Sequence, residues 1–119
     1  MSYLGQSSGY HDEVSILGEL EQAVMDALWR RSAPTSVRDV HEELRGRREI
    51  AYTTVMTVLD RLAKKGTVVR QLDGRAWLYL PAQSRVELYT AAIEDMLADL
   101  EPHDRRDVWE RLRGPVPAE

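Results

Sequence analysis

The stretch AYTTVMTVLDRLAKKG, residues 51–66, decides the fold of this chain. Its apolar residues recur at helical spacing, which predicts a helix over residues 52–65, and Gly66 is the residue type that commonly follows a helix end. β-branched residues are stiff and are poorer helix formers than Ala, Leu or Glu. The helix nevertheless contains five of them: Thr53, Thr54, Val55, Thr57 and Val58. Helix propensity alone therefore does not explain the composition.

A helical wheel at about 100° per residue separates this segment into two faces. The apolar face holds Val55, Val58, Leu59 and Leu62. The opposite face carries hydroxyls and a thioether in the first two turns and then charges: Thr53, Met56, Thr57, Asp60 and Lys64. One flank is formed by Thr54, Arg61 and Lys65. The valines are expected in the core, whereas the threonines need a different explanation.

Two shorter helices are predicted before this segment. Apolar residues at helical spacing, with acidic residues first and arginines last, predict a helix over residues 19–31 whose Trp29 is expected in the core. Ser36 with Asp39 resembles a capping box and begins a second helix over residues 37–45. His41 has no second histidine at a ligand spacing, so we expect a solvated helix face there rather than a metal site.

After Gly66 the spacing of apolar residues changes from the helical period of about 3.6 residues to the strand period of about 2. Residues 67–72 and 76–80 alternate as strands do, and Asp73 with Gly74 between them is a strong signal for a two-residue hairpin turn. Three helices followed by a β-hairpin is the order of a winged helix-turn-helix. The predicted class is therefore mainly α with a small β-hairpin (α+β), a winged helix-turn-helix followed by C-terminal dimerisation helices.

The C-terminal part has a narrower apolar pattern than the rest of the chain. Val86, Tyr89, Ile93, Met96 and Leu100 follow a heptad-like spacing, and a last helix from about residue 104, capped by Asp104 with Asp107, adds three further residues. These are Val108, Trp109 and Leu112. We expect this seam to join two copies of the chain, although folding back onto the chain's own domain is the alternative.

These patterns predict three regions. Residues 1–16 are expected to be a flexible arm, residues 17–82 a winged helix-turn-helix domain, and residues 83–119 a helical dimerisation region with a short tail. The sequence has no Cys, no apolar run long enough to span a membrane and no visible signal peptide, so we expect a cytoplasmic protein. With scattered histidines and no phosphate-binding loop, we expect no enzyme activity, no metal and no cofactor.

The charge distribution is uneven. The formal net charge is −4, yet residues 51–75 hold 5 basic and 2 acidic side chains, while residues 1–50 hold 6 and 9 and residues 76–119 hold 5 and 9. The region around the predicted helix over residues 52–65 is therefore the only net basic one. Chance clustering of charges on a solvated face is the simpler explanation, and nucleic-acid binding is the functional one.

In a helix-turn-helix the second helix lies in the major groove, and its first turns meet base edges. Threonine offers both a hydroxyl and a methyl group, so Thr53, Met56 and Thr57 are candidates for base contact, with Thr54 on the flank. Candidate phosphate contacts are Arg38, Arg61, Lys64, Lys65, Arg70 and Arg75. Asp60 would be repelled by phosphate, and we expect it to pair with Lys64 at i+4.

Four stretches are specific when they are taken together: LGELEQAVMDALW (17–29), SVRDVHEEL (36–44), AYTTVMTVLDRLAKKG (51–66) and RAWLYLP (75–81). They resemble the BlaI/MecI family of bacterial transcriptional repressors. The resemblance implies a homodimer that binds double-stranded DNA at a palindromic operator and represses genes for resistance to cell-wall antibiotics or related stress. The family's DNA-contact positions correspond to Thr53, Thr54, Met56 and Thr57, with Arg61 near the backbone.

The chain departs from the family pattern at three points. Ala51 stands where members often have a capping Ser. The resemblance implies a membrane sensor protease as a partner for induction, but that protease cuts an Asn-Phe bond and the chain has no Phe. Without Cys the chain also lacks the Cys-x-Cys metal site of the related copper-responsive repressors. The alternative function is a winged-helix module that binds another protein.

Overall fold

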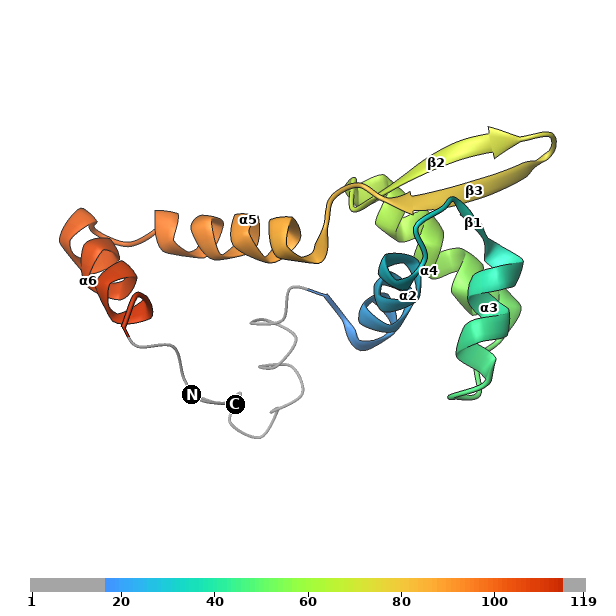
Figure 1. Ribbon diagram of the computed structural model, residues 1–119, viewed down its shortest axis with the longest axis horizontal. Coiled ribbons are helices and arrows are strands. Elements are labelled where there is room, and N and C mark those ends of the chain that lie inside the picture. The colour runs from blue at the N-terminus through green and yellow to red at the C-terminus, as the bar shows by residue number, and fades with distance from the viewer. Residues whose placement is uncertain (1–16, 115–119) are drawn as a thin grey trace, which may run out of the picture. The chain divides into compact units, whose positions relative to one another are not determined.

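The computed structural model describes residues 17–114. The chain divides into two compact units, Met1–Arg85 and Val86–Glu119, whose helices and strands are labelled in Figure 1. Together the described residues form five helices and a three-stranded antiparallel sheet. No helix within residues 17–114 is long and apolar enough to cross a membrane. The predicted arm over residues 1–16 lies outside the described residues.

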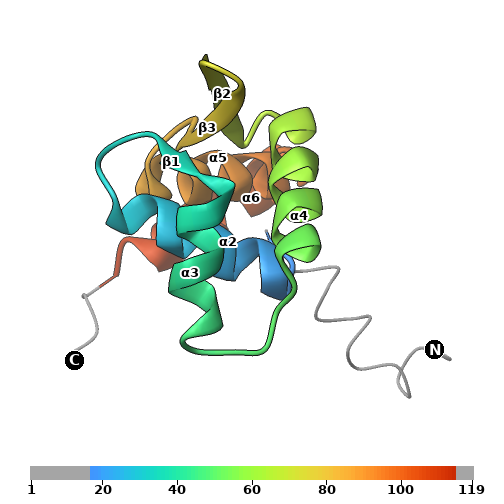
Figure 2. The same ribbon diagram turned by 90° about the vertical axis from the view of Figure 1, so that its right-hand side faces the viewer.

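The first unit is a cluster of three helices with a hairpin at one end. The helices are α2 (Glu19–Arg30), α3 (Val37–Arg45) and α4 (Tyr52–Lys65). In Figure 2, α4 stands at one edge of the cluster, and the hairpin lies beyond its C-terminal end. The largest fully buried side chains all come from these helices: Met25, Leu28, Leu59, Leu62, Val24, Val40 and Val55.

The predicted helix limits of the first unit are confirmed to within one residue. The backbone N–H of Asp39 donates to Ser36 Oγ over 3.1 Å, which caps α3 as expected. Gly66 follows α4 with a φ of 82°, and the next N–H, that of Thr67, donates to the Leu62 carbonyl over 2.9 Å. This left-handed C-cap is nearly free of steric cost only for Gly, and it ends α4 sharply.

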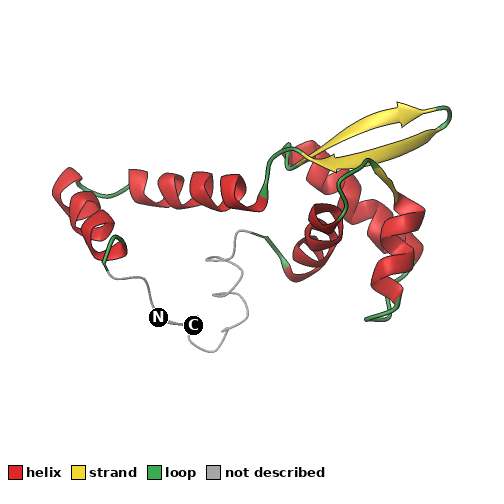
Figure 3. Ribbon diagram, in the orientation of Figure 1, coloured by secondary structure: helices red, strands yellow, loops and turns green. Residues whose placement is uncertain are grey.

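The sheet has the strand order β1 (Thr35–Ser36), β3 (Ala76–Pro81) and β2 (Val68–Asp73). The two-residue strand β1 was not predicted; it pairs Thr35 with Tyr79 and ties the turn before α3 to the hairpin. Figure 3 shows the hairpin as a long pair of strands closed by a short loop. The fold is a winged helix, as the sequence predicted.

The predicted hairpin turn was displaced by one residue. Asp73 still pairs with Ala76, so the turn is formed by Gly74 and Arg75 rather than by Asp73 and Gly74. Gly74 has a φ of 65°. Glycine with positive φ at the first central position is the arrangement of a type II′ hairpin. Arg75 therefore lies at the tip of the wing.

Trp29 was predicted in the core, but the structure places it half-buried at the edge of the first unit. Its indole Nε1–H donates to the Gln83 carbonyl over 3.0 Å, and the Arg85 guanidinium carbon lies 4.6 Å from the ring centroid. Arg85 also pairs with Asp26 over 2.9 Å. A buried indole needs an acceptor for its N–H, and the segment after the wing supplies it at the edge rather than inside.

The second unit contains most of α5 (Arg85–Ala98) and the whole of α6 (Pro102–Leu112). The prediction that the last helix begins at about residue 104 with an Asp cap was wrong. Glu101 is the N-cap residue and Pro102 occupies the first helical position, where its missing N–H has no cost. Among residues 86–114 Leu97 is the one buried apolar side chain.

Candidate nucleic-acid interface

The outer face of α4 is the candidate interface. Met56 is 44% exposed, and Thr53 and Thr57 are exposed beside it, while Thr54 on the flank is half-buried. A shallow hollow of about 290 Å³ borders this face and is lined by Leu20, Thr53, Thr54, Thr57, Val58 and Arg61. The inner residues Val55 and Val58 are buried as the wheel predicted. The β-branched residues of the helix therefore divide between the core and an open surface.

The basic side chains around α4 differ in whether they are already paired. Lys64 Nζ lies 3.2 Å from one Asp60 carboxylate oxygen, which confirms the predicted i+4 pair. The other Asp60 oxygen lies 3.5 Å from Arg70 Nη1, a contact that was not predicted. Asp60 is thus neutralised by a cation from its own helix and by one from the wing.

Lys65 takes part in a more enclosed ion pair. Its ammonium group donates to both carboxylate oxygens of Glu21, over 2.9 and 3.0 Å, and the Glu21 side chain is only 9% exposed. Glu21 also accepts from the Gly18 N–H over 3.4 Å. A carboxylate this far from water needs such partners, because an unpaired buried charge is costly. Lys65 therefore links the end of α4 to the first turn of α2.

Three of the predicted phosphate contacts have no ion-pair partner within residues 17–114: Arg38 on α3, Arg61 on α4 and Arg75 at the wing tip. All three are exposed. Arg47, in the loop before α4, is likewise exposed and has no ion-pair partner within residues 17–114, and it was not among the predicted residues. The basic composition of that loop was visible in the sequence and could have identified Arg47.

The N-terminus of α4 has no side-chain cap. Ala51 is the N-cap residue, and its carbonyl accepts from the N–H groups of Thr54 and Val55 over 3.1 and 3.2 Å. His41, expected on a solvated face, instead lies half-buried against this turn. Its Nε2 is 2.9 Å from the Ile50 carbonyl oxygen, and its ring meets the Tyr52 ring edge-on at 5.6 Å. His41 of α3 therefore helps to hold the start of α4 in place.

A cluster of ion pairs joins α2 to α3 behind the interface. The Glu43 carboxylate accepts from Arg30 and, over 3.3 Å, from Arg31. Partial burial acts to raise the pKa of Glu43, but the hydrogen bonds and charges of the two arginines outweigh it and hold this pKa below its ordinary value of 4.5. The pair therefore stabilises the helix arrangement when Glu43 is ionised.

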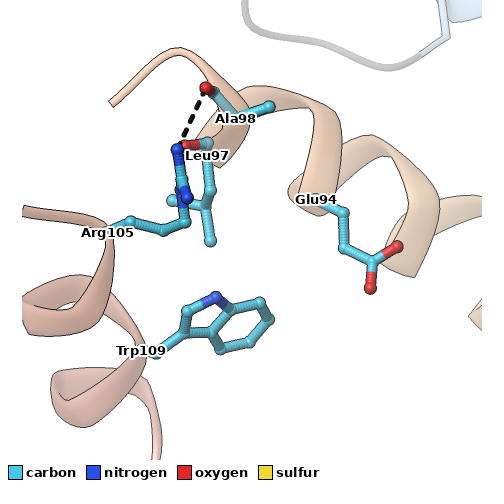
Figure 4. Close-up of a pocket in the computed structure, with 5 residues that line it drawn as sticks. All are labelled: Glu94, Leu97, Ala98, Arg105 and Trp109. Atoms are coloured by element: carbon cyan, nitrogen blue, oxygen red, sulfur yellow. Dashed lines mark hydrogen bonds between the residues drawn. The ribbon is translucent and has the colours of Figure 1, made fainter. Parts of the chain in front are cut away.

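The predicted dimerisation residues are exposed or half-buried in the second unit. Val86, Ile93, Met96 and Leu112 are exposed, whereas the remaining four are half-buried: Tyr89, Leu100, Val108 and Trp109. A hollow of about 340 Å³ lies between α5 and α6. Figure 4 shows the residues that line it, with Arg105 of α6 hydrogen-bonded to Ala98 at the end of α5. Arg105 donates to the Leu97, Ala98 and Leu100 carbonyls and so satisfies the C-terminal end of α5.

Chemistry other than binding has little support among the described residues. Within residues 17–114 no group of three or more His, Asp or Glu side chains is arranged to hold a metal ion. His103 lies beside Asp104 at 3.3 Å on the exposed surface of α6. These histidines occupy structural or surface positions.

The fold and this surface define a winged helix-turn-helix protein. Its α4, the second helix of the helix-turn-helix, has one exposed face. The penicillinase repressor family model matches residues 17–112, and the chain therefore belongs to this family. It is 53% identical over 90 residues to the transcriptional regulator BlaI of two Mycobacterium tuberculosis strains, CDC 1551 / Oshkosh and H37Rv. The match covers 76% of this chain and 65% of those relatives, so the chain spans less than two thirds of their length.

Two solved structures support the same assignment. The DNA-binding domain of the repressor BlaI in solution matches 58% of this chain and 83% of its own length, with 29% identity and a TM-score of 0.53. The monomeric form of Bacillus licheniformis BlaI in complex with the blaP half-operator matches 60% of this chain and 85% of its own length, with 28% identity and a TM-score of 0.52. The similarity thus includes a structure with bound DNA.

Proposed function

We propose that the protein is a sequence-specific DNA-binding transcriptional repressor whose α4 enters the major groove. The observation that carries the proposal is the exposed face of α4, where Thr53, Met56 and Thr57 stand open on a helix whose other face is fully buried. Family membership and the relative in complex with a half-operator support it. Such a repressor works in the cytoplasm, where the DNA is, and needs no enzymatic activity.

The roles of individual side chains follow from their surroundings. We assign base contacts to Thr53, Thr54, Met56 and Thr57, because hydroxyl and methyl groups can read the pattern of base edges in the major groove. Phosphate contacts are assigned to the exposed cations Arg38, Arg61, Lys64 and Arg75, with Arg47 added. Lys64 is paired with Asp60, but its side chain is 77% exposed, so it stays a candidate phosphate contact. Lys65 and Arg70 are paired and less exposed, at 45% and 37%, and we give them positioning roles instead.

The missing cap at Ala51 fits the same function. A helix N-terminus without a side-chain acceptor leaves N–H groups available, and a DNA phosphate is a suitable acceptor for them. His41 and Tyr52 hold the turn in place without occupying those groups. The N-terminus of α4 can therefore be ordered and still be open to an anion.

We further propose that the protein acts as a homodimer on a palindromic operator. In α5 and α6, apolar side chains at heptad-like spacing are open to solvent, including Val86, Ile93 and Met96. Water-exposed apolar seams of this kind are stabilised by a second helix, and a second copy gives a closed two-fold assembly. Two copies would present two recognition helices to two half-sites.

A sensor protease is the partner that family membership suggests for release from DNA. Induction by a sensor protease that cuts an Asn-Phe bond is not available within these 119 residues, because they contain no Phe. Cleavage within these residues would therefore need a different bond. A response to cell-wall antibiotics or related stress is what membership of the family suggests for the regulated genes.

The proposal is tested with a gel shift on a DNA fragment that contains the protein's own promoter region. A large excess of unrelated DNA is present, and the experiment is repeated at two salt concentrations. We expect a shifted band that survives the competitor and weakens steeply at the higher salt, because phosphate contacts release counterions. Loss of the band with competitor at both concentrations would favour the alternative, a winged-helix module that binds another protein.

A further inference from the structure

Three segments of the first unit meet where the wing leaves the helices. Asp60 comes from α4, Arg70 from β2 and Trp77 from β3. Arg70 Nη1 lies 3.5 Å from an Asp60 oxygen, while the Arg70 guanidinium carbon lies 4.7 Å from the centroid of the Trp77 ring. One side chain therefore bridges the recognition helix and the far strand of the wing.

The strand register explains why this contact forms. Arg70 is opposite Tyr79 and Leu72 is opposite Trp77, so Arg70 and Trp77 are diagonal neighbours on one face of the hairpin. Tyr79 on the same face is only 3% exposed, so the base of this face packs against the core, while Trp77, two residues nearer the tip, is 43% exposed. The Arg70 side chain is consequently directed towards α4 rather than away from it.

Arginine is suited to such a bridge. Its guanidinium is planar, so it can stack on an aromatic ring and donate to a carboxylate in its own plane at the same time. A lysine ammonium is a point charge that cannot do both with this geometry. The Arg70 side chain is 37% exposed, less than that of Lys64 at 77%, and its ion pair and its stacking contact are both within the protein.

We propose that Arg70 is a positioning residue that sets the wing against the recognition helix, with Asp60 as its anchor and Trp77 as its stacking partner. The proposal rests on the DNA-binding function proposed above and refines it. It explains why a carboxylate lies on the proposed DNA-facing side of α4. Asp60 anchors the wing through Arg70, and Lys64 offsets its remaining charge.

Replacing Asp60 distinguishes an anchor for the wing from a carboxylate that only repels phosphate, because the two roles predict opposite changes in DNA affinity. If Asp60 only repels phosphate, Asp60→Asn strengthens DNA binding. On our proposal it weakens binding to the promoter fragment by about tenfold, because the wing loses its anchor. Glu49→Gln is the matched control: Glu49 is an exposed carboxylate in the loop before α4 with no ion pair within residues 17–114. This control should strengthen binding slightly to promoter and unrelated DNA alike.

Replacing Arg70 separates positioning from phosphate contact. We expect Arg70→Lys and Arg70→Ala to weaken promoter binding by similar factors, with the slope of log K against log salt unchanged. If Arg70 instead contacts a phosphate, Lys restores most of the affinity, and Ala reduces the magnitude of that slope by about 0.9. Either of those results, measured by fluorescence anisotropy, overturns the proposal.

The wing can also be examined without DNA. In the free protein, Asp60→Asn should move backbone amide resonances along β2 and β3, whereas Glu49→Gln should leave them in place. Unmoved resonances would overturn the positioning role even if the protein binds DNA well. Conversely, wild-type protein that fails to distinguish the promoter from unrelated DNA would refute the proposed function, while the amide shifts would still decide the role of Arg70.

Discussion

The two units of the chain differ in how they bury their apolar side chains. In the first unit seven large side chains from α2, α3 and α4 are fully buried, so its core is complete within one chain. In the described part of the second unit Leu97 alone is buried, while Val86, Ile93 and Met96 are open to water. The first unit has a closed core of its own, and the second leaves apolar side chains exposed, which is the basis for the proposed dimer.

The two units also differ in net charge. Residues 1–85 carry 12 basic and 11 acidic side chains, whereas residues 86–119 carry 4 basic and 9 acidic ones. The overall charge of −4 therefore lies in the second unit, which phosphate would repel, while the first unit is slightly basic. The candidate DNA-contacting residues and the candidate dimerisation residues thus lie in different units of the chain.

The largest expected effect is on the core of the first unit. Leu59 is fully buried, so Leu59→Ala should lower the free energy of unfolding by about 2–5 kcal/mol. Chemical denaturation followed by circular dichroism measures this change. The control Leu72→Ala removes the same atoms from a side chain that is 60% exposed on the wing and should change stability by less than about 0.5 kcal/mol. Equal losses at the two sites would refute the assignment of the core.

The next effect concerns the seam of the second unit. Ile93→Asp combined with Met96→Asp should give a monomer that binds the promoter fragment poorly, because charges would oppose each other across the two-fold axis. Sedimentation velocity measures the oligomeric state. Thr90→Asp combined with Ala91→Asp adds the same charge at exposed positions outside the seam and should leave a dimer. A dimer in the seam variant would show that the seam is wrong.

A smaller effect is expected from the ion pairs between α2 and α3. Since the pKa of Glu43 is lowered in the folded protein, its stabilisation is present above the ordinary value of 4.5 and is lost as pH falls through the folded value. Glu43→Gln should therefore destabilise the protein at neutral pH and should lose less stability on acidification than the wild type. Thermal unfolding over this pH range tests it. If the variant lost as much stability as the wild type on acidification, the role of this ion pair would be contradicted.

The smallest effect concerns the uncapped start of α4. Ala51→Ser supplies a side-chain acceptor and should raise the free energy of unfolding by about 0.5–1 kcal/mol. Denaturant unfolding detects a change of this size. A loss of stability would mean that His41 and Tyr52 already hold the turn in a geometry that a capping serine disturbs.

The elements that the sequence predicted well are those with local signals. Period, caps and turn residues lie within a few positions of one another, so the limits of α3 and α4 and the left-handed Gly66 could be predicted. The strand β1 has two residues, too few for any period, and depends on pairing with Tyr79. The turn at Gly74 was displaced by one residue because the strand register, which is a tertiary property, decides it.

The candidate site could also be predicted only where its features are local in the sequence. The exposed face of α4 follows from helical geometry and is found as expected, although its contacts with bases remain a prediction. The pairing of Lys65 with Glu21 joins residues 44 positions apart, and no local pattern indicates it. Arg70 could be recognised as a wing cation from the sequence, but its position between Asp60 and Trp77 could not.

The central claim is that the exposed threonine face of α4 reads DNA, and Thr57→Glu tests it most directly. Fluorescence anisotropy with the labelled promoter fragment should show that specific binding is lost, while the unfolding temperature and oligomeric state match the wild type. Thr90→Glu, which adds the same charge on α5, should bind normally. Wild-type affinity for the promoter fragment in the Thr57→Glu variant would contradict the account.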